Sequence, residues 1–324
     1  MDRARLEAWL GVRITDMARL SGGAIQQNWA LDVERDGAPE AWVLRTDNAA
    51  TLPESLSRAQ EFALLKAAHA ASVTVAEPLL LCEDIAVTGA PFFIMRRVAG
   101  QASGHANAKR AAAMGGDAGL AAAHGRELAR VHRTAPPAFL GAAPAAPMAA
   151  FIAEMRARID ALGRPRPPLE WALRFLETHP PPPRQPVLCH RDFRTGNVMI
   201  ADGQITAVLD WEFAAWGDPH EDLGWFSARC WRFGQDALEA GGIGSLDHFL
   251  AGYAAEAGWQ PQPFTVRIWQ LAATIRWAVI AAGQAARHLS GREPSLELAL
   301  TGHMVPELEL DALNMTERLR AGTA

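Results

Sequence analysis

Four polar residues stand at spacings that suit phosphoryl transfer. His190 and Asp192 follow the apolar segment 187–189, Asn197 comes five residues after Asp192, and Asp210 follows a short polar turn. Phosphoryl transfer from ATP needs a carboxylate that orients the attacking hydroxyl and accepts its proton, and hard oxygen ligands that hold Mg²⁺ against the phosphates. Asp192, with His190 beside it, fits the catalytic role. Asn197 and Asp210 fit the role of metal ligands.

The segment between Asn197 and Asp210 determines whether the two metal ligands can meet. Residues 198–200 and 205–209 are predicted to be short strands around a turn, because branched apolar residues flank a Gly-containing polar tetrapeptide. A hairpin folds back on itself, so Asp210 returns close to Asn197. The alternative is a loop whose Asp and Asn only cap turns. The coincidence of strand, motif, hairpin and second Asp favours the catalytic interpretation.

The composition limits the class of protein. The chain has 324 residues, enough for one large domain or two lobes. Its net charge is -5, from 31 Lys and Arg against 36 Asp and Glu, so it has no global basic field for nucleic acid. Three scattered cysteines, Cys82, Cys189 and Cys230, are too few for a disulfide framework or a zinc site. That number favours a reducing compartment.

The apolar runs predict a soluble cytoplasmic protein with no membrane partner. Residues 1–14 form a short charged amphipathic stretch without the apolar core of a signal peptide. The longest apolar run, 268–282, is interrupted by Gln270, Thr274 and Arg276. It is shorter than the ~20 residues that a membrane span needs.

A glycine turn near the N-terminus suits phosphate binding. Ser21, Gly22 and Gly23 lie between two predicted strands, and glycines at such a junction let backbone N–H groups approach phosphate oxygens. The simpler interpretation is a Gly-Gly turn that only joins two strands.

A cation and a carboxylate follow at a spacing that suits a phosphate clamp. Arg45 ends the predicted strand 41–45, and Glu61 lies sixteen residues later on the predicted helix 56–70. In a nucleotide cleft such a cation binds the α and β phosphates and is held by the carboxylate. The alternative is a surface arginine with a solvated glutamate.

Two further strands are predicted at 73–81 and 91–98, and the second leads into a short linker. At such a hinge the backbone of Arg96 and Val98 would pair with adenine, and Met95 would line its pocket, although a Met on a strand more often belongs to the core.

The rest of the chain is predicted to be helical. The Gly- and Ala-rich stretch 100–121 is expected to be partly mobile. Helices are expected at 122–133, 148–162, 169–178, 221–233, 245–257, 265–289, 293–300 and 305–319. His124 and His132 lie two turns apart, but packing roles are favoured over a metal pair. Asp222 either caps its helix or braces the catalytic loop at His190 or Arg191, and bracing is preferred.

Taken together, these residues resemble the aminoglycoside phosphotransferase family, the choline-kinase-like small-molecule kinases. The match runs from SGGAIQQNWAL and VLR through FFIMRRVAG to HRDFRTGN, LDWEFAAWGDPHEDLGWF and RWAVIAAGQAARHL. It looks closest to the branch of the kinase-like domain joined to some acyl-CoA dehydrogenases. The resemblance implies an α+β, bilobal, protein-kinase-like fold, with a small antiparallel-sheet N-lobe (1–98) and a larger, mainly helical C-lobe (99–324). It also implies ATP or GTP between the lobes and Mg²⁺ on Asn197 and Asp210.

Three residues depart from the family pattern. Arg191 replaces the Gly common in the antibiotic kinases, and Arg45 replaces Lys, as it often does in this branch. Trp211-Glu212 replaces Phe-Gly after the metal Asp, as in related branches, so an activation-loop switch is not expected.

The resemblance implies that the phosphate acceptor is a small hydroxyl compound, but the family name does not identify that compound. Glu212, Arg276 and Arg287 are predicted on the substrate side. The arginines there favour a neutral or anionic acceptor, such as a hydroxylated acyl or CoA-linked metabolite, over a polycationic drug. The residues in question are Arg229, Arg232, Arg276, Arg287, His288 and Arg292. Equally favoured is that these cations only pair with Glu293, Glu297, Glu307 and Glu309.

Two other functions compete with a metabolite kinase, and the oligomeric state stays open. One is an aminoglycoside or other antibiotic kinase. The other is a nucleotide-binding pseudokinase that acts as a partner module, which Arg45 in place of Lys suggests.

Overall fold

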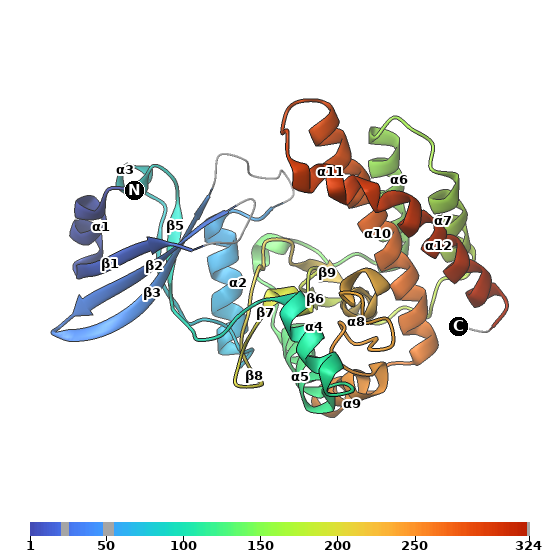
Figure 1. The fold of residues 1–324 in the computed structure, drawn as a ribbon, viewed down its shortest axis with the longest axis horizontal. Helices are drawn as coiled ribbons and strands as arrows, with labels where there is room; N and C mark the ends of the chain where they lie inside the picture. The colour runs from blue at the N-terminus through green and yellow to red at the C-terminus, as the bar shows by residue number, and fades with distance from the viewer. Residues whose placement is uncertain (21–25, 48–54, 323–324) are drawn as a thin grey trace.

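A computed structural model describes residues 1–20, 26–47 and 55–322. Figure 1 shows a small sheet at one end of the molecule and a larger helical body at the other. The elements of the sheet lobe are α1 (Arg3–Leu10), β1 (Arg13–Arg19), β2 (Gln26–Arg35), β3 (Ala38–Asp47), α2 (Arg58–Ala70), β4 (Pro78–Cys82), α3 (Ile85–Thr88) and β5 (Phe92–Arg96). The five strands are antiparallel in the order β1-β2-β3-β5-β4. The predicted α+β fold with a small antiparallel sheet is confirmed.

Alternation along β3 gives the sheet two different faces. Trp42 and Leu44 are buried on one face, in a cluster that includes Leu6 of α1. Arg45 is one residue further along, so it faces the other side, where it pairs with Glu61 of α2. The pleat of one strand thus places the cation on the side of the sheet that α2 covers.

Helix α2 is fixed at its start and along one side. Ser57 and Gln60 form a capping box that satisfies the first backbone N–H groups. Leu64 and Leu65 are buried in a cluster with Phe93 of β5. Glu61 lies one turn before these leucines, so it shares their inward face.

The helical lobe contains all later elements. They are α4 (Gly104–Ala113), α5 (Ala118–Arg133), α6 (Pro147–Ala161), α7 (Pro167–Thr178), β6 (Val187–Cys189), β7 (Val198–Ala201), β8 (Gln204–Val208), β9 (Ala215–Gly217), α8 (Pro219–Ser227), α9 (Leu246–Ala257), α10 (Pro263–Leu289), α11 (Leu296–His303) and α12 (Val305–Arg320). Single 3₁₀ turns lie at Ala138–Leu140, Thr195–Asn197 and Arg229–Trp231. The predicted larger, mainly helical lobe is confirmed.

Close helix contacts hold this lobe together. Helices α5 and α9 approach so closely that a Cβ on Gly125 would lie 2.1 Å from a backbone oxygen of α9. Helix α10 is predominantly buried along its length and packs against α7, α8, α11 and α12. Although it has 27 residues, neither it nor any other helix in the described ranges has the apolar length of a membrane span.

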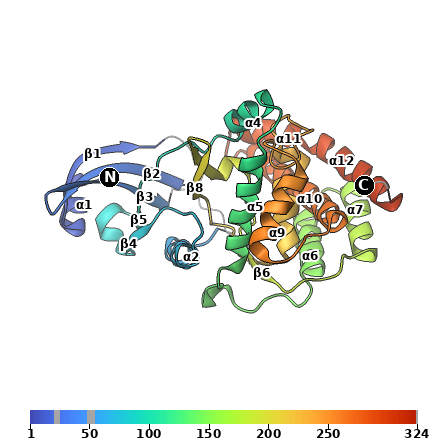
Figure 2. The same ribbon diagram turned by 90° about the horizontal axis from the view of Figure 1, so that it is seen from below.

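The predicted catalytic hairpin forms as β7 and β8, and the N–H of Leu209 donates to the carbonyl of Asn197 at 2.8 Å. The hairpin also contacts the sheet lobe, since the N–H of Val208 donates to the carbonyl of Thr74 at 2.7 Å. Figures 1 and 2 show it between the sheet and the helices. The proposed lobe boundary at residue 98 lies just before the bridge of Gln101 with Ile200, and it stays a prediction.

The expectation of mobility for 100–121 was wrong, because α4 and the start of α5 form there. Ser103 and Asp117 cap the two helices by accepting N–H groups of Ala106 and Leu120. The small side chains that suggested disorder instead permit close packing, and Ala108 and Ala111 are fully buried.

Two other predicted elements are shorter than expected. Strand formation begins at Pro78 instead of residue 73, because the N–H and hydroxyl of Thr74 both donate to Glu127. The helix predicted at 221–233 ends at Ser227, where the chain turns before the 3₁₀ turn at Arg229–Trp231. This early end turns the chain so that Trp231 packs beside Trp225.

Candidate active site

Asp192 lies in the loop after β6, where three side chains hold its carboxylate. Trp225 Nε1 and Arg194 Nε donate to Oδ1 at 3.1 and 3.3 Å, and Asn197 Nδ2 donates to Oδ2 at 2.6 Å. Burial raises the pKa of Asp192, while Arg194 acts in the opposite direction. The carboxylate is therefore both oriented and more basic than usual, which suits a proton acceptor.

Two hydrogen bonds to Asp192 fix which end of the Asn197 amide faces the catalytic carboxylate. Its Nδ2 donates to both the backbone carbonyl and the Oδ2 of Asp192, at 2.9 and 2.6 Å. The backbone carbonyl can only accept, and the Asp192 carboxylate also accepts hydrogen bonds from Arg194 and Trp225, so the NH₂ group of Asn197 faces both partners. The amide oxygen Oδ1 then faces away from Asp192. It is a hard oxygen with no partner among the described residues, as a Mg²⁺ ligand requires.

Asp210 follows β8 in a left-handed conformation, with φ of 58°. Arg45 Nη2 donates to its Oδ1 at 2.9 Å. Burial alone would raise the pKa of Asp210, but the guanidinium of Arg45 holds it below its ordinary value. The side chain is 38% exposed, and Oδ2 has no partner in the described part of the chain. Asp210 thus presents an ionised oxygen next to Asn197, and this donor set fits Mg²⁺.

Arg45 and Glu61 form a buried pair, with 3.0 Å between Nε and Oε1. Their residues are 6% and 1% exposed, which excludes the alternative of a surface arginine with a solvated glutamate. Burial alone would lower the pKa of Arg45, but Glu61 and Asp210 raise it overall. Glu61 also pairs with Arg58, whose Nε lies 2.9 Å from Asp47 Oδ1. The network therefore holds the Arg45 cation next to the proposed metal ligands.

His190 positions the catalytic loop and does not itself face a reacting group. Its Nε2 donates to the carbonyl of Leu209 at 2.8 Å, and its Nδ1 accepts the N–H of Asp192 at 3.3 Å. Burial lowers the pKa of His190, so the ring is neutral with its proton on Nε2. The imidazole thereby links the residues that precede Asp210 to Asp192.

Asp222 braces the same loop from α8. Its Oδ2 accepts the N–H of His190 at 2.6 Å, and its Oδ1 accepts the N–H of Arg191 at 2.8 Å. The preferred bracing role, rather than a helix cap, agrees with these contacts, since the cap of α8 is Asp218. Burial alone would raise the pKa of Asp222, but the hydrogen bond from His132 lowers it overall.

Arg191 shows why a glycine is expected at its position. Its φ is 63°, a left-handed conformation that costs a residue with a Cβ atom about 1–2 kcal/mol. The fold holds it there through the bond to Asp222 and through Arg191 Nε, which donates to Glu221 Oε1 at 2.9 Å. The larger side chain therefore gains an ion pair in place of the flexibility of glycine.

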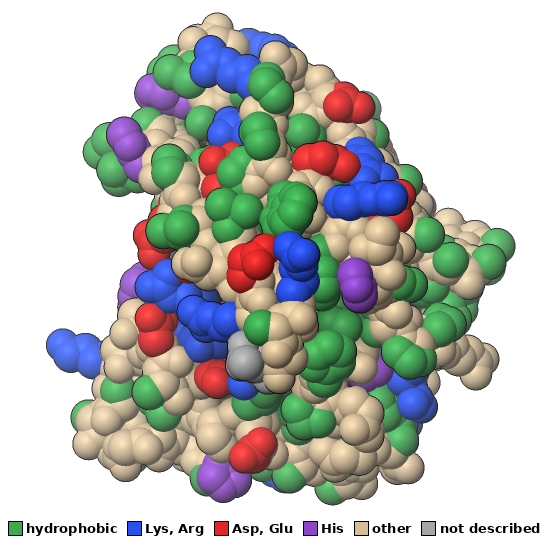
Figure 3. Space-filling view, turned by 90° about the vertical axis from the view of Figure 1, so that its right-hand side faces the viewer, with side chains coloured by type: hydrophobic (Ala, Val, Ile, Leu, Met, Phe, Trp, Pro, Cys, Tyr) green, Lys and Arg blue, Asp and Glu red, His purple; other side chains and the backbone are tan. Residues whose placement is uncertain are grey.

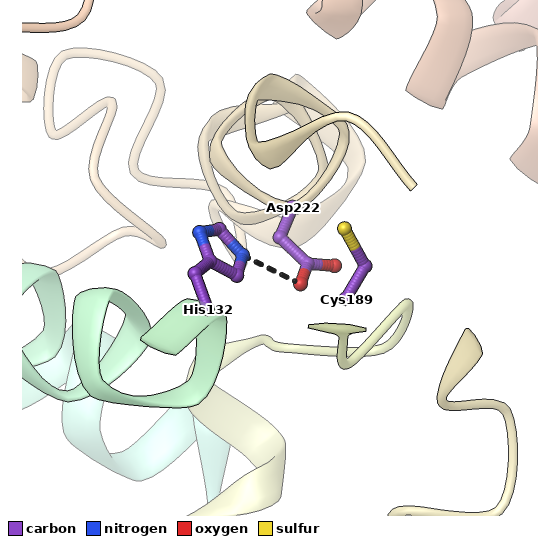
Figure 4. Close-up of side chains that lie close together, drawn as sticks. All are labelled: His132, Cys189 and Asp222. Carbon is purple, nitrogen blue, oxygen red and sulfur yellow. Dashed lines mark hydrogen bonds and ion pairs between the residues drawn. The ribbon is translucent and has the colours of Figure 1, made fainter. Parts of the chain in front are cut away.

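His132, Cys189 and Asp222 gather close enough to suggest a metal site. Figure 4 shows His132 and Cys189 on either side of the Asp222 carboxylate. However, His132 already bonds Asp222 at 3.1 Å and the hydroxyl of Tyr253 at 2.8 Å, and Cys189 Sγ donates to the carbonyl of Asp218. Burial raises the pKa of the Cys189 thiol, which disfavours the thiolate that a metal needs. The cluster is a hydrogen-bonded brace.

The proposed adenine side is only partly described. Ser21, Gly22 and Gly23 lie outside the described residues. Met95 is half-buried against the main core. The N–H of Arg96 donates to the carbonyl of Glu77 at 2.9 Å. In the described residues, the N–H of Val98 has no partner, so it is the available backbone donor at this hinge.

Arg229, Arg232, Arg276 and Arg287, four of the arginines predicted on the acceptor side, are engaged in ion pairs. Arg276 pairs with Glu221, and Arg287 pairs with Glu293. Arg229 contacts Glu307 and Asp311, at 3.0 and 2.9 Å. Arg232 donates to the carbonyls of Ser227 and Asp236. Two of the predicted partners, Glu293 and Glu307, form such pairs, whereas Arg276 pairs with Glu221, which was not predicted. These contacts favour pairing within the fold, so these charges no longer indicate an anionic acceptor.

Glu212 lies beside the proposed metal ligands, at the side of the sheet lobe. Its Oε2 accepts the hydroxyl of Ser55 at 2.8 Å, and its carbonyl accepts the N–H of Leu56 at 2.9 Å. Burial raises the pKa of Glu212. This residue therefore joins the catalytic segment to the start of α2, in addition to its proposed place near substrate.

The sequence reasoning missed Arg194 and Trp225, both of which touch Asp192. Arg194 lies inside the HRDFRTGN segment and was available as a cation next to the base. Trp225 lies three residues after Asp222 on α8, so it shares a helical face with the brace. That spacing was the signal for its proximity to the loop.

The outer face of the helical lobe carries both signs of charge. Figure 3 shows basic and acidic side chains next to one another on the face at the right of Figure 1. A hollow of about 440 Å³ on the lobe is lined by Arg229, Arg232, Arg267 and Arg318, but also by Asp236, Glu239 and Asp311. Neighbouring carboxylates offset these arginines.

Comparison with known proteins identifies the family. A model of the phosphotransferase enzyme family matches residues 16–259. The chain belongs to this family. The predicted resemblance is thus confirmed, and the protein is a phosphotransferase with the kinase-like site described above.

Curated relatives of this phosphotransferase are longer proteins. Acyl-CoA dehydrogenase family member 11 of Gallus gallus is 27% identical over 267 residues, which is 76% of this chain and 33% of the relative. Acyl-CoA dehydrogenase family member 10 of Mus musculus is 29% identical over 197 residues, which is 56% of this chain and 18% of the relative. The chain spans a third or less of the length of these two relatives.

Solved structures share the fold of this phosphotransferase along the whole chain. A Ralstonia eutropha protein assigned to the aminoglycoside phosphotransferases has a TM-score of 0.74 at 21% identity and covers 98% of both chains. A choline/ethanolamine kinase family protein from Mesorhizobium loti has a TM-score of 0.61 at 18% identity, over 97% of this chain and 93% of that one. The predicted bilobal kinase-like fold is therefore confirmed.

Proposed function

We propose that this phosphotransferase transfers the γ-phosphate of ATP, or of GTP, to a hydroxyl group of a small metabolite. The observation that carries the proposal is the arrangement of Asp192, Asn197, Asp210 and Arg45. A carboxylate with a raised pKa and two hard oxygens without a partner in the described residues lie on the loop after β6 and the β7–β8 hairpin, and the buried Arg45 cation of β3 contacts Asp210 there. Phosphoryl transfer requires these groups, and little covalent chemistry beyond them.

The residues divide the work between proton transfer and charge neutralisation. Asp192 orients the acceptor hydroxyl and takes its proton as the new O–P bond forms and the bond to the leaving nucleoside diphosphate breaks. The Asn197 and Asp210 oxygens would hold Mg²⁺, which would neutralise phosphate charge. Arg45 supplies a further cation for the phosphates, held in place by Glu61. Val98 offers its N–H to adenine.

The acceptor is proposed to be a hydroxylated acyl or CoA-linked compound. The support is the similarity to acyl-CoA dehydrogenase family members 10 and 11. The shared segment covers most of this chain but a minor part of those proteins. In this proposal the kinase-like segment phosphorylates a compound related to acyl-CoA, the substrate class that the names of these two relatives indicate. The proposed location in the cell is the cytoplasm.

Asp192→Asn tests the proposed base. Phosphoryl transfer from labelled ATP to a metabolite extract should be lost, while Mg²⁺·ATP still raises the melting temperature, because the amide keeps the shape but accepts no proton. The exposed residue Asp160 on α6 provides the matched control, and Asp160→Asn should retain full transfer. Transfer by Asp192→Asn at the wild-type rate would contradict the assignment.

The two alternative functions, an antibiotic kinase and a nucleotide-binding partner module, predict different experimental results. For an antibiotic kinase, expression in a susceptible host should raise its tolerance to aminoglycosides or macrolides, and unchanged tolerance excludes that function. For a nucleotide-binding partner module, ATP should stabilise the wild-type protein without turnover of any hydroxyl compound. Turnover in the extract assay excludes a pseudokinase.

A further inference from the structure

An aromatic cluster lies directly beside the proposed base. Trp225 of α8 donates its indole N–H to Asp192, and its ring lies 5.1 Å from the ring of Trp231. Trp231 in turn lies 4.7 Å from Trp277 of α10. The side chain of Arg194, which also contacts Asp192, stacks over Trp231 at 5.0 Å. Trp231 is therefore linked to the base through two separate neighbours.

The cluster continues from the buried interior to a partly open edge. Trp225 and Trp231 are 2% and 9% exposed, whereas Trp277 and Ile280 are only partly buried. Trp277 and Ile280 lie three residues apart on α10, so they share one helical face. We call the surface formed by Trp231, Trp277 and Ile280 the tryptophan shelf.

The shelf has polar groups that the fold leaves unused. The indole N–H groups of Trp231 and Trp277 have no acceptor within the described residues. A shielded donor without a partner is costly, but Trp269 in the core of the helical lobe also has an indole N–H without an acceptor among the described residues, so the proposal rests on the aromatic contacts beside Asp192.

Charge near the shelf argues against a polycationic ligand. Glu221, on the same helix as Trp225, is already shared by Arg191 and Arg276. Arg194 adds a cation, and its terminal nitrogens have no partner in the part of the chain that the structure describes. A molecule with several ammonium groups would therefore meet cations and indole rings instead of free carboxylates.

We propose that the tryptophan shelf binds the apolar body of the phosphate acceptor and thereby selects hydroxyl compounds with an apolar or aromatic body over polyols and polycations. This proposal rests on the proposed function, since it assigns the acceptor side of the same site. Trp277 is the residue that determines this preference, because it is the larger of the two partly buried members of the shelf and its ring contacts Trp231.

The test compares acceptors with different bodies. The wild-type protein with Mg²⁺·ATP is offered phenylpropanol, a long-chain hydroxy acid, inositol and kanamycin, and ADP release is measured. The apolar-bodied alcohols should have the highest kcat/KM. Trp277→Ala should lower that value for them about 30-fold, mainly through KM, which corresponds to about 80 Å² of lost apolar contact. The KM for ATP should be unchanged.

Two variants separate recognition from folding. Trp171 on α7 is 47% exposed, and its side chain contacts Glu317 and Arg320 of α12 instead of the cluster, so Trp171→Ala is a matched control that should leave all acceptors unaffected. Trp277→Phe keeps an aromatic ring, and it should retain most of the apolar preference if Trp277→Ala proves unstable. An equal loss for every acceptor in Trp277→Phe, or a wild-type preference for inositol or kanamycin, would overturn the proposal.

A binding arm keeps this inference distinct from the proposed function. Calorimetry with phenylpropanol in the presence of Mg²⁺·ADP should show binding by the wild-type protein and a loss of about 30-fold in Trp277→Ala. Binding of this kind without any transfer would refute the proposed function and support the shelf. Transfer to inositol without binding of phenylpropanol would refute the shelf and support the proposed function.

Discussion

Asp222 is the single residue on which the shape of the catalytic loop depends most directly. It is fully buried, and its two oxygens accept three hydrogen bonds, from the backbone N–H groups of His190 and Arg191 and from His132 Nε2. The distances to the two N–H groups are 2.6 and 2.8 Å. The loop between β6 and Asp192 therefore has one carboxylate as its main support.

Replacing this carboxylate by an amide should be costly although the shape is kept. Asp222→Asn retains one acceptor oxygen and places an NH₂ group against a donor that had been satisfied. One unsatisfied buried donor costs about 1–3 kcal/mol, and the loss of charge-assisted bonds adds about 1 kcal/mol. We expect a loss of about 2–4 kcal/mol in the free energy of unfolding and a fall of at least tenfold in kcat, because Asp192 loses its position.

Urea denaturation followed by tryptophan fluorescence measures the first quantity, and ADP release measures the second. Asp247 provides the control, since it also lies in the first turn of a helix but is exposed. Asp247→Asn should change the free energy of unfolding by less than about 0.5 kcal/mol. If Asp222→Asn falls within that range and keeps its kcat, the brace is not what positions the base.

The same pair of proteins predicts a pH dependence. The pKa of Asp222 is lowered in the folded state, so its contribution is fully present above the unfolded pKa of about 3.9 and is lost as the pH falls through the folded value. The stability difference between wild type and Asp222→Asn should therefore be constant near neutral pH and shrink below about pH 4. A difference that grows on acidification would contradict this assignment.

Three further perturbations test the neighbouring groups. Arg45→Lys should raise the KM for ATP about tenfold, because one ammonium group replaces the two nitrogens that contact Glu61 and Asp210. Steady-state kinetics with varied ATP measures this KM. An unchanged KM would count against the role of Arg45 as a phosphate clamp. Trp225→Phe should move the acidic limb of the kcat/KM profile to higher pH, since it removes a donor to Asp192, whose pKa burial already raises; a limb at lower pH would contradict this role. Asp210→Asn should abolish the thermal stabilisation by Mg²⁺·ATP, which in the wild type amounts to about 2.7 kcal/mol at a hundred times Kd; a melting shift equal to that of the wild type would argue against Asp210 as a ligand.

Local sequence carried most of the information about the catalytic segment. The hairpin was predictable because branched residues flank Asp202-Gly203, both of which adopt positive φ in the structure. The return of Asp210 toward Asn197 followed from that turn alone. By contrast, Trp231 joins the site only because the chain leaves α8 at Ser227, and a helical pattern extending to Phe233 concealed this turn.

Composition was misleading where small residues pack. The stretch 100–121 lacks large apolar side chains, yet α4 forms because its alanines fit closely against neighbouring elements and Ser103 caps its start. The ion pairs could not be predicted from the sequence either. Arg276 lies 55 residues from Glu221, so no spacing in the sequence shows that its charge is neutralised within the fold.

The replacement of Lys by Arg at position 45 is explained by its surroundings. The side chain is buried between two carboxylates that it meets with different nitrogens, Nε toward Glu61 and Nη2 toward Asp210. A guanidinium can satisfy two fixed acceptors in one plane, whereas an ammonium is a single point charge. Arg58 further fixes Glu61 from the other side. Arg45 in place of Lys suggested a pseudokinase, but Glu61, Asp210 and Arg58 form a network that an arginine satisfies. This network favours an active nucleotide site over an inactive one.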